Sequence, residues 1–586
     1  MSNEVIFLIF RRMRLPLIIL VLSYAVSIFG FTLVPGQDDQ GRPWHMDFFH
    51  AFYFVSFMGS TIGFGEIPYP FTDAQRYWAI FTIYLTVIAW LYGIGTLISL
   101  IQEPAFRRAI THARFRRAVR RLRDPFYLVC GYGDTGEHLV RVMVDRFHQA
   151  VVVDIDPDRI NHLEIAQLPM DVPGLTADAS DPTILEDAGL RHPACQGVVA
   201  LTNDDSANLH IALAARLLAP DERIIVRAES RAAVANLQSF GIHDVINPYD
   251  SFAEWLAMAI HSPSLYLIHD WMIGLYHRPL ADLLQPPKGL WIICGFGRFG
   301  KAVYENLRRE GVEVIVVDAY PDQNGAPAGA ILGRGTEAAT LKEAGIDRAV
   351  GIVAGTNDDA DNLSIILTAK ELKPGLFTVA RQNRSRNGAL FSRMLKESPD
   401  DRTGLLDLVM QPAEMMAQKV VALMMAPMLV RFLAYARQQD NEWANILISR
   451  IIDVTGEDEH PVTWRIKITP EGAPAVYEML REGREVMLDD LEHDPRYREK
   501  RLHVVPLMIE RPGEGSIMLP DMDLSLRLGD RILFAGLPEA RGSMALLVHN
   551  YNALEYVVTG IERPSGLVWR WLDGLRHSPA QEDIRN

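Results

Sequence analysis

Residues 58–68 read Met-Gly-Ser-Thr-Ile-Gly-Phe-Gly-Glu-Ile-Pro, and this stretch decides how the N-terminal part of the chain is interpreted. Its glycines, Gly63 and Gly65, can adopt backbone conformations that are closed to other residues. The stretch follows an aromatic run, Phe48 to Met58, and lies between two long apolar segments. Irregular backbone at membrane depth is tolerated only inside protein or along a water-filled cavity. The pattern therefore favours a structured loop within a membrane over an ordinary glycine-rich turn.

The two apolar segments are long enough to be membrane spans. Leu15 to Val34 contains 20 residues without a charge, and Tyr77 to Ile101 contains 25. As helices, both can cross a hydrocarbon core of about 30 Å. We expect spans at 15–34 and 77–101, with a helix and loop at 48–66 between them. A cleaved signal peptide is the alternative for the first segment, but its apolar part is long and a second span follows.

Arginines flank the two spans on their outer sides, whereas the intervening segment is poor in Lys and Arg. By the positive-inside rule, this asymmetry places both termini in the cytoplasm of a multi-pass protein of the cell (inner) membrane. The second cluster, within 106–124, also suits a solvated helical linker. The arginines are Arg11, Arg12 and Arg14 before the first span, and Arg107, Arg108, Arg114, Arg116, Arg117, Arg120, Arg121 and Arg123 after the second.

The rest of the chain has the composition of an acidic, water-facing body. A length of 586 residues indicates several folding units. A net charge of −15 argues against nucleic-acid binding, which normally needs a basic face. The three cysteines, Cys130, Cys195 and Cys294, have neither disulfide-framework nor zinc-site spacing, which fits a reduced cytosol.

A dinucleotide-binding pattern begins beyond Arg123. Phe126 to Cys130 is a predicted strand, Gly131-Tyr132-Gly133-Asp134-Thr135-Gly136 turns it into a helix, and a second strand ends in Asp154. In this pattern a helix N-terminus receives pyrophosphate and the acidic residue holds a ribose hydroxyl. Alternation of short apolar runs with helical periodicity predicts a parallel sheet covered by helices.

The pattern then repeats. Residues 291–300 read Trp-Ile-Ile-Cys-Gly-Phe-Gly-Arg-Phe-Gly and lead to a strand that ends in Asp318. Both the cysteine pair (294 − 130) and the acid pair (318 − 154) are separated by 164 residues. Thr-Asn-Asp-Asp at 202–205 recurs at 356–359, and Val226-Arg227 recurs as Ala380-Arg381. The chain therefore contains a tandem repeat.

The loop between the spans resembles the selectivity filter of potassium channels, usually Thr-Val-Gly-Tyr-Gly-Asp. In that family, four loops meet on an axis and their carbonyl groups replace the ion's water shell. The resemblance implies a K⁺ filter made of Thr61, Ile62, Gly63, Phe64 and Gly65. The departures at Ile62, Phe64 and Glu66 leave the carbonyl arrangement intact, but Phe64 lacks the hydroxyl that ties the usual filter to its surroundings.

The second span also resembles the inner helix of ligand-gated prokaryotic channels, through Gly93-Ile94-Gly95-Thr96. Glycine costs about 1 kcal/mol inside a helix and marks either a kink or close helix packing. The resemblance implies a hinge at Gly93 and an intracellular gate at Leu97, Ile98 and Ile101.

The tandem repeat resembles RCK domains, which regulate potassium conductance, so the whole chain is similar to prokaryotic two-transmembrane potassium channels with tandem RCK domains. The expected fold is a membrane α-helical pore followed by α/β Rossmann-like lobes and a small C-terminal α+β lobe. The expected domains are the pore at 1–105, the basic linker at 106–124, RCK1 at 125–287, the Rossmann-like lobe and crossover helix of RCK2 at 288–440, and its C-terminal lobe and tail at 441–586. The resemblance implies a homotetramer in the lipid bilayer with a ring of eight RCK domains.

The resemblance also implies gating by an adenine nucleotide, NAD first and ADP or ATP next. Arg298 would add charge to the second site, whereas Asp134 would repel phosphate at the first, so one motif without a ligand is an open alternative. The expected binding residues are Gly131, Gly133, Gly136, Asp154, Asp156, Asp178, Gly295, Gly297, Arg298, Gly300 and Asp318.

Other functions fit the sequence less well. Gly295 to Lys301 matches a P-loop, but Ala302 replaces the Ser or Thr that holds magnesium, and no catalytic motif points to an enzyme. Acidic clusters at 204–205, 358–361 and 489–494 could bind Ca²⁺, although solvated surface is favoured because none has calcium-loop spacing. A nucleotide-binding regulatory subunit of a potassium uptake system and a membrane-anchored dehydrogenase are the alternatives, and the two spans and filter argue against the first.

Overall fold

A computed structural model describes residues 3–273, 286–395, 404–456, 459 and 461–562. Residues 274–285 of the predicted RCK1 domain and 563–586 of the predicted tail lie outside this part. The chain divides into two compact units, one consisting chiefly of Met1–Arg123 and one containing almost all of the rest.

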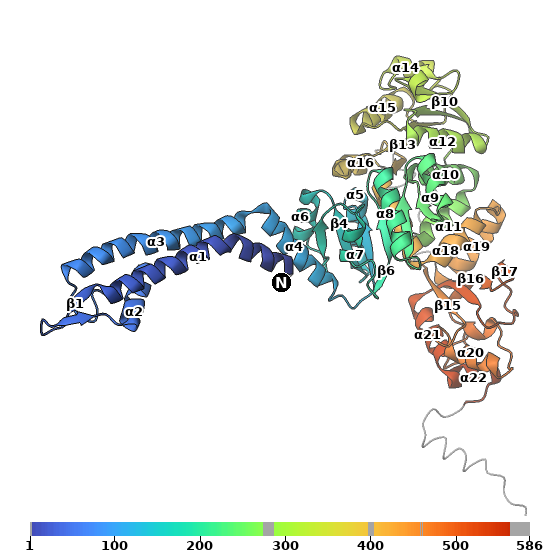
Figure 1. Ribbon diagram of the computed structural model, residues 1–586. Helices are drawn as coiled ribbons and strands as arrows, with labels where there is room; N and C mark the ends of the chain where they lie inside the picture. The colour runs from blue at the N-terminus through green and yellow to red at the C-terminus, as the bar shows by residue number, and fades with distance from the viewer. Residues whose placement is uncertain (1–2, 274–285, 396–403, 457–458, 460, 563–586) are drawn as a thin grey trace, which may run out of the picture. The chain divides into compact units, whose positions relative to one another are not determined.

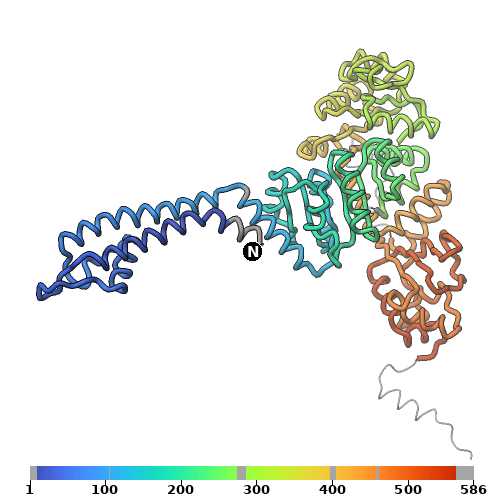
Figure 2. Tube along the Cα trace, viewed as in Figure 1, coloured from blue at the N-terminus to red at the C-terminus, as the bar shows by residue number. Residues whose placement is uncertain are grey.

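The first unit is helical. Its elements are α1 (Asn3–Leu33), β1 (Pro35–Gln37), β2 (Pro43–His45), α2 (Phe48–Gly59), α3 (Asp73–Gln102) and α4 (Pro104–Val119). Helices α1 and α3 run side by side (Figures 1 and 2), and their segments Ile9–Leu33 and Asp73–Gln102 are long and apolar enough to cross a membrane. Helix α3 begins at a capping box, in which Thr72 and Gln75 satisfy each other's backbone N–H groups. The two predicted spans are therefore confirmed as apolar helices.

The contact between α1 and α3 depends on a small residue. A Cβ atom on Gly30 would lie 2.0 Å from the Trp78 ring, and the Trp78 indole N–H donates to the Ser27 carbonyl at 3.1 Å. Small residues let membrane helices approach each other closely. Many large apolar side chains on α1 and α3 remain exposed within the single chain, as expected of helices that face lipid and other subunits.

The second unit contains two similar α/β lobes. Their sheets have the strand orders β5-β4-β3-β6-β7-β8 and β11-β10-β9-β12-β13-β14, and the recorded pairings are parallel. The predicted Rossmann-like fold is thus confirmed in both repeats. The first lobe contains β3 (Phe126–Cys130), α5 (Asp134–Asp145), β4 (Gln149–Asp154), α6 (Pro157–Ile165), β5 (Gly174–Thr176), α7 (Pro182–Asp187), β6 (Cys195–Ala200), α8 (Asp205–Leu218), β7 (Arg223–Arg227), α9 (Arg231–Ser239) and β8 (Asp244–Ile246). The second contains β9 (Leu290–Cys294), α12 (Arg298–Arg309), β10 (Glu313–Asp318), α13 (Pro321–Asn324), β11 (Ile331–Leu332), α14 (Ala338–Glu343), β12 (Gly351–Ala354), α15 (Asp359–Leu372), β13 (Phe377–Arg381), η1 (Ser385–Asn387), α16 (Gly388–Met394) and β14 (Leu408–Met410).

The lobes exchange the helices that follow them. Helix α10 (Pro248–His261) follows the first lobe but packs on the second, where Phe252 and Leu256 join a core with Phe299. Helix α17 (Pro412–Met425) follows the second lobe but packs on the first, where Val420 joins a core with Leu139. Helices α17 and α18 (Pro427–Ala436) meet at 112° and would count as a third span only if taken as one broken helix. The apolar face of α17 is buried in the core of the first lobe, and that of α18 is buried in a separate core with α11 and α19.

The C-terminal lobe is antiparallel, with the strand order β15-β18-β16-β17. Helices α11 (Pro263–Ile273), α18 and α19 (Asn441–Thr455) share a core with β16 and β18. The lobe contains β15 (Val462–Lys467), α20 (Pro474–Arg481), η2 (Asp489–Glu492), β16 (Val504–Arg511), β17 (Gly515–Met518), β18 (Arg531–Gly536), α21 (Pro538–His549) and α22 (Tyr551–Thr559).

One buried carboxyl group in this lobe predicts a pH dependence of stability. Glu492 is 3% exposed, its Oε1 has no hydrogen-bond partner among the described residues, and Arg501 lies 3.6 Å from Oε2. Burial raises the pKa of Glu492 from 4.5 to about 7, although Arg501 opposes the shift. Because the folded state binds the proton more tightly, this group favours folding below about pH 4.5, and that contribution is lost as pH rises through about 7.

We therefore expect Glu492→Gln to flatten the pH profile. Between about pH 5 and pH 8, the wild-type lobe should lose about 3 kcal/mol that the variant keeps. Hydrogen exchange of β16 and β18 amides, corrected for intrinsic rates, measures the local opening free energy. Glu499→Gln removes the same charge at an exposed position and serves as the control. Equal slopes for both variants and the wild type would contradict the assignment.

Candidate pore and ligand-binding sites

The loop after α2 has an alternating backbone. Thr61, Gly63 and Gly65 have φ angles of 63°, 66° and 100°, whereas Ile62 and Phe64 between them do not have positive φ. In an extended chain of uniform conformation, successive carbonyl groups point to opposite sides. Inverting φ at every second residue turns successive carbonyls toward one side, as a ring of ion-coordinating oxygens requires. A positive φ is unusual for a β-branched residue, and strained backbone of this kind clusters at functional sites.

Backbone and side-chain contacts hold both ends of this loop. The Ile62 N–H donates to the Phe57 carbonyl at 3.0 Å, and the Phe64 ring lies edge-on to the Phe57 ring at 5.5 Å. At the other end, Glu66 accepts hydrogen bonds from the Phe71 N–H at 2.8 Å and from Arg76 Nε at 2.9 Å. An aromatic contact is thus present at Phe64, which lacks the hydroxyl of the usual filter. The Glu66–Arg76 pair ties the loop to α3 and was not anticipated.

The predicted hinge and gate lie on an unbroken helix. Helix α3 continues through Gly93 to Gln102, and a Cβ atom on Gly93 would meet nothing within 4 Å. Close packing within this chain therefore does not account for the glycine. The predicted gate residues Leu97, Ile98 and Ile101 are exposed on the same helix. Their roles remain predictions.

The two glycine motifs have matching geometry. Gly131 and Gly295 have φ angles of 105° and 96° at the strand-to-helix turn. A Cβ atom on Gly136 would lie 2.1 Å from the Gly131 carbonyl oxygen, and one on Gly300 would lie 1.9 Å from that of Gly295. The first and third glycines are therefore required by the fold.

The middle glycines are different. A Cβ atom on Gly133 would meet only the flexible end of Arg159, at 3.4 Å, and one on Gly297 would meet nothing within 4 Å. Both residues cap helices, α5 and α12, and neither cap has a side-chain hydrogen bond. The fold itself therefore does not require glycine at these two positions, and phosphate binding there stays a prediction.

The acidic residues assigned to ribose binding are held by the backbone. Asp154 accepts hydrogen bonds from the N–H groups of Tyr132 and Asp156, at 2.5 and 2.8 Å. Asp318 accepts from the N–H groups of Phe296 and Tyr320, at 2.6 and 2.7 Å, and from the Asn324 amide at 2.8 Å. Both carboxylates are buried, so they fix the glycine turns whether or not they also contact a ribose.

Two further predicted binding residues occupy turns beside the first motif. Asp156 caps α6 by accepting from the Asp158 N–H at 3.0 Å. Asp178 accepts from the Ser180 N–H and Oγ at 2.9 and 2.7 Å, and these bonds lower the pKa of Asp178. Their orientation is thus set locally, at the carboxyl edge of the sheet where α/β folds place ligands.

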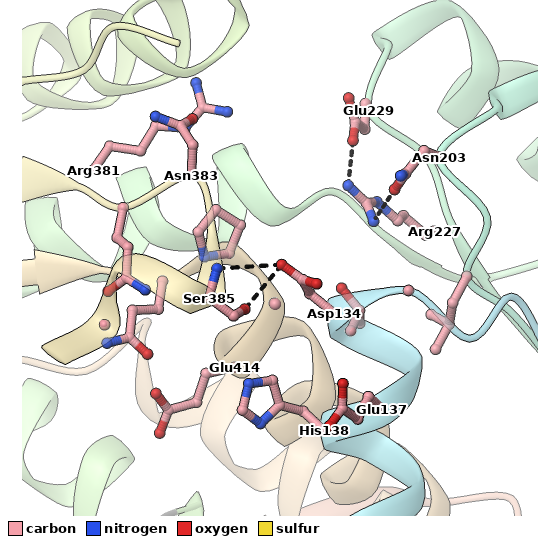
Figure 3. A pocket seen from close by; sticks show the side chains of 18 of the residues that line it. Asp134, Glu137, His138, Asn203, Arg227, Glu229, Arg381, Asn383, Ser385 and Glu414 are labelled. Carbon is pink, nitrogen blue, oxygen red and sulfur yellow. Dashed lines mark hydrogen bonds and ion pairs between the residues drawn. The ribbon is translucent and has the colours of Figure 1, made fainter. Parts of the chain in front are cut away.

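A cavity of about 620 Å³ opens between the two lobes and includes the first glycine motif (Figure 3). The second lobe contributes the end of β13 and the start of α17 to its wall. Asp134, at the start of α5, accepts from the Ser385 N–H and Oγ at 3.3 and 2.9 Å. The negative charge predicted to repel phosphate is therefore turned toward the second lobe, and Arg159, which pairs with Asp154 and Asp156, lies beside Gly133.

An ion-pair network crosses this cavity. Glu229, at the end of β7, pairs with Arg227 of its own lobe and with Arg298 of the second lobe, the latter at 2.5 Å. Arg381 lies 5.0 Å from the centroid of the Tyr249 ring, and burial lowers the pKa of Arg381. Arg298, predicted to serve the second glycine motif, thus lines the cavity of the first. Glu229 thus pairs with one arginine from each lobe, and Asp134, Glu137 and Glu414 add negative charge to the lining of the cavity.

Within the part of the chain that the structure describes, three residues that line this cavity also contain buried polar atoms without hydrogen-bond partners. Among the described residues, Arg227 Nε, Arg381 Nε and Gln382 Oε1 are buried and have no hydrogen-bond partner. All three residues line the cavity. Buried polar groups are normally satisfied, and such exceptions commonly mark a functional site.

The repeated Thr-Asn-Asp-Asp segments position these arginines. Asn203 accepts from Arg227 at 2.9 Å, and Asn357 accepts from Arg381 at 3.0 Å. The first aspartate of each segment caps α8 or α15, and Asp205 and Asp359 accept from backbone N–H groups across the loop. Within the described part of the chain, no group of three or more His, Cys, Asp or Glu side chains could hold a metal ion. Asp204, Asp205, Asp358 and Asp359 thus hold helix ends and loops, and a Ca²⁺ role for the acidic clusters stays a prediction.

The two units of the chain match different protein families. The ion-channel family model matches residues 17–103, and the TrkA-N domain model matches 127–248 and 291–397. The chain joins an ion-channel domain to two TrkA-N domains. The prediction of a channel pore followed by tandem RCK lobes is confirmed by these matches.

Two archaeal proteins and one solved channel structure are similar to parts of this chain. Potassium channel protein 1 of Methanocaldococcus jannaschii is 26% identical over 242 residues, which cover 41% of this chain and 68% of the relative. An uncharacterized protein of Methanothermus fervidus is 26% identical over 253 residues, and the chain spans 37% of its length. The structure of the GsuK channel bound to NAD is 18% identical with a TM-score of 0.46, covering 93% of this chain and 100% of that one.

Proposed function

We propose that this chain is the subunit of a potassium-selective channel that intracellular adenine nucleotides open or close. The observation that carries the proposal is the alternating φ of Thr61 to Gly65 in a loop between two apolar spans. Four such loops, with Ile62 and Phe64 between the inverted residues, would present rings of carbonyl oxygens to K⁺. The arginine flanks support cytoplasmic termini, and the apolar surfaces left exposed on α1 and α3 support a homotetramer in a bilayer.

The nucleotide, NAD or ADP or ATP, would bind in the inter-lobe cavity of the first TrkA-N domain. Its phosphates would approach Gly133 and the free N-terminus of α5, with Arg159, Arg227 and Arg298 supplying positive charge. Because Arg298 belongs to the second lobe, the ligand would contact both lobes and favour one spacing between them. The second glycine motif is the weaker site, since Arg298 is directed to Glu229. A Ca²⁺ role is less well supported, because the candidate acids already cap helices.

The energetic requirement is modest. A shift from 1:99 to 99:1 between closed and open states needs about 5.5 kcal/mol of differential binding, or about 1.4 kcal/mol for each of four sites. A ring of eight RCK lobes would transmit the change through residues 106–124 to Gly93, and Leu97, Ile98 and Ile101 would form the gate. The glycine motifs would act by binding alone, without catalysis.

Current recordings from reconstituted protein test both K⁺ selectivity and nucleotide gating. Under a K⁺ gradient with Na⁺ opposite, we expect the reversal potential to follow K⁺, and NAD, ADP or ATP on the cytosolic side to change the open probability. A reversal potential that ignored K⁺ would exclude a K⁺ filter. An open probability indifferent to all three nucleotides would exclude nucleotide gating. A protein that conducts no ions but binds nucleotide would instead favour a regulatory subunit of a potassium uptake system.

A further inference from the structure

The corner where α1, α3 and α4 meet contains a polar cavity that the pore and the TrkA-N domains do not explain. Its volume is about 410 Å³, and it is lined by Arg12, Thr96, Ser99, Leu100, Gln102 and Glu103. Phe106 and Leu100 form a small core with Ile9, which brings the start of α4 back against α1. The cavity therefore has a defined wall and lies where both spans end.

The cavity is closed on one side by a weak ion pair. Arg12 Nη2 lies 3.0 Å from Glu103 Oε1, and the two side chains are 61% and 32% exposed. Exposed pairs of this kind contribute about 0–1 kcal/mol. A second anion could therefore take Arg12 from Glu103 at little energetic cost.

The surroundings have a large excess of positive charge. Glu103 is the only acidic residue in 9–33 and 96–120, whereas these segments contain many arginines. Arg11 and Arg14 are exposed beside Arg12, and Arg107 donates from Nε to the Ile101 carbonyl at 3.1 Å. Ser99 and Gln102 offer further hydrogen-bond donors to an anion. The chemistry of the cavity matches a phosphate group.

Apolar surface next to the cavity distinguishes a lipid from a soluble phosphate. Phe10, Leu15 and Ile18 on α1 are exposed, as are Ile98 and Ile101 on α3. A headgroup in the cavity would place its acyl chains along these side chains. Basic clusters directly beside a span attract anionic lipids by about 1 kcal/mol per Lys or Arg.

We infer that this cavity binds the headgroup of an anionic phospholipid, whose phosphate replaces Glu103 as the partner of Arg12. Binding would release the tie between the first span and the end of α3, the segment that carries the proposed gate. Lipid binding itself does not depend on the proposed channel function, so the two can be tested separately.

The test is native mass spectrometry of the purified full chain in detergent, with phosphatidylglycerol, phosphatidylcholine or inorganic phosphate added. We expect phosphatidylglycerol to bind in preference to phosphatidylcholine, Arg12→Gln to weaken its binding about fivefold or more, about 1 kcal/mol, and Glu103→Gln to leave it equal or tighter. Arg191→Gln removes the same charge from an exposed position in the first lobe and should have no effect. Because Glu103→Gln removes only the competing anion, it tests the idea even if Arg12→Gln folds poorly.

Three results would overturn the inference. Unchanged phosphatidylglycerol binding in Arg12→Gln would exclude Arg12 as the ligand group. Weaker binding in Glu103→Gln would show that the pair supports the site instead of competing with it. Displacement of the lipid by inorganic phosphate would assign the cavity to a soluble anion.

Discussion

Replacement of Gly63 by alanine is expected to abolish K⁺ conduction while the protein still folds. Gly63 has a φ of 66°, and a left-handed conformation costs an L-residue about 1–2 kcal/mol. Four subunits would pay this cost in one ring, about 4 kcal/mol or more in total. Relaxation of the strain would turn carbonyl groups away from the axis. Since each 1.4 kcal/mol corresponds to a factor of ten, we expect K⁺ flux into vesicles to fall more than about 100-fold.

Gly41 provides a matched control for this variant. It has a φ of 75°, and, as at Gly63, a Cβ atom would meet nothing within 4 Å. It lies in the turn between β1 and β2, outside the proposed filter. Gly41→Ala therefore carries a similar backbone strain but should conduct normally. Equal K⁺ flux in the two variants would show that the backbone of Gly63 does not coordinate the ion.

Replacement of Gly133 by alanine is expected to remove nucleotide binding without unfolding the first TrkA-N domain. The side chain has room in the free protein, because only the end of Arg159 lies within reach. A phosphate approaching the N-terminus of α5 would meet the new methyl group. We expect the affinity for NAD, ADP or ATP to fall about 10- to 100-fold, or about 1.4–2.8 kcal/mol, in calorimetric titrations.

The companion variant Gly297→Ala identifies which lobe is occupied. Its side chain meets nothing within 4 Å, so it also leaves the fold intact. If only the first cavity binds nucleotide, Gly133→Ala alone should lose affinity. Gly375→Ala, at another open glycine without positive φ, controls for the substitution itself. Normal affinity in both Gly133→Ala and Gly297→Ala would exclude phosphate binding at either motif.

Local patterns predicted the strands well. The strand expected at 126–130 has the same bounds in the structure, and the second expected strand ends in Asp154, as predicted. Buried parallel strands are short apolar runs, and a following glycine or aspartate ends them clearly. The spans were predicted less accurately at their ends. Helix α1 begins at Asn3, well before Leu15, because arginine is a good helix former and hydropathy does not report where a helix starts.

Contacts between repeats could not be predicted from either repeat alone. Nothing in the sequence of α17 identifies the first lobe as the partner of that helix. Likewise, the sequence does not show that Arg227 donates a hydrogen bond to Asn203. Asp134 was expected to weaken the first site because its negative charge lies in the glycine motif. The sequence does not show that Ser385, about 250 residues later, donates hydrogen bonds to it. Glu492 lies in an acidic run that suggested solvated surface, and only the packing of the C-terminal lobe buries it.

The exchange of α10 and α17 between the lobes has a consequence for synthesis of the protein. The apolar face of α5, which includes Leu139 and Met143, is covered by α17, and α17 is translated only after the whole second lobe. The first lobe therefore leaves the ribosome with this face uncovered, behind spans already committed to the membrane. Such transiently exposed surfaces promote aggregation. We expect chains cut before Pro412 to be retained by chaperones or degraded, even though their pore domain is unchanged.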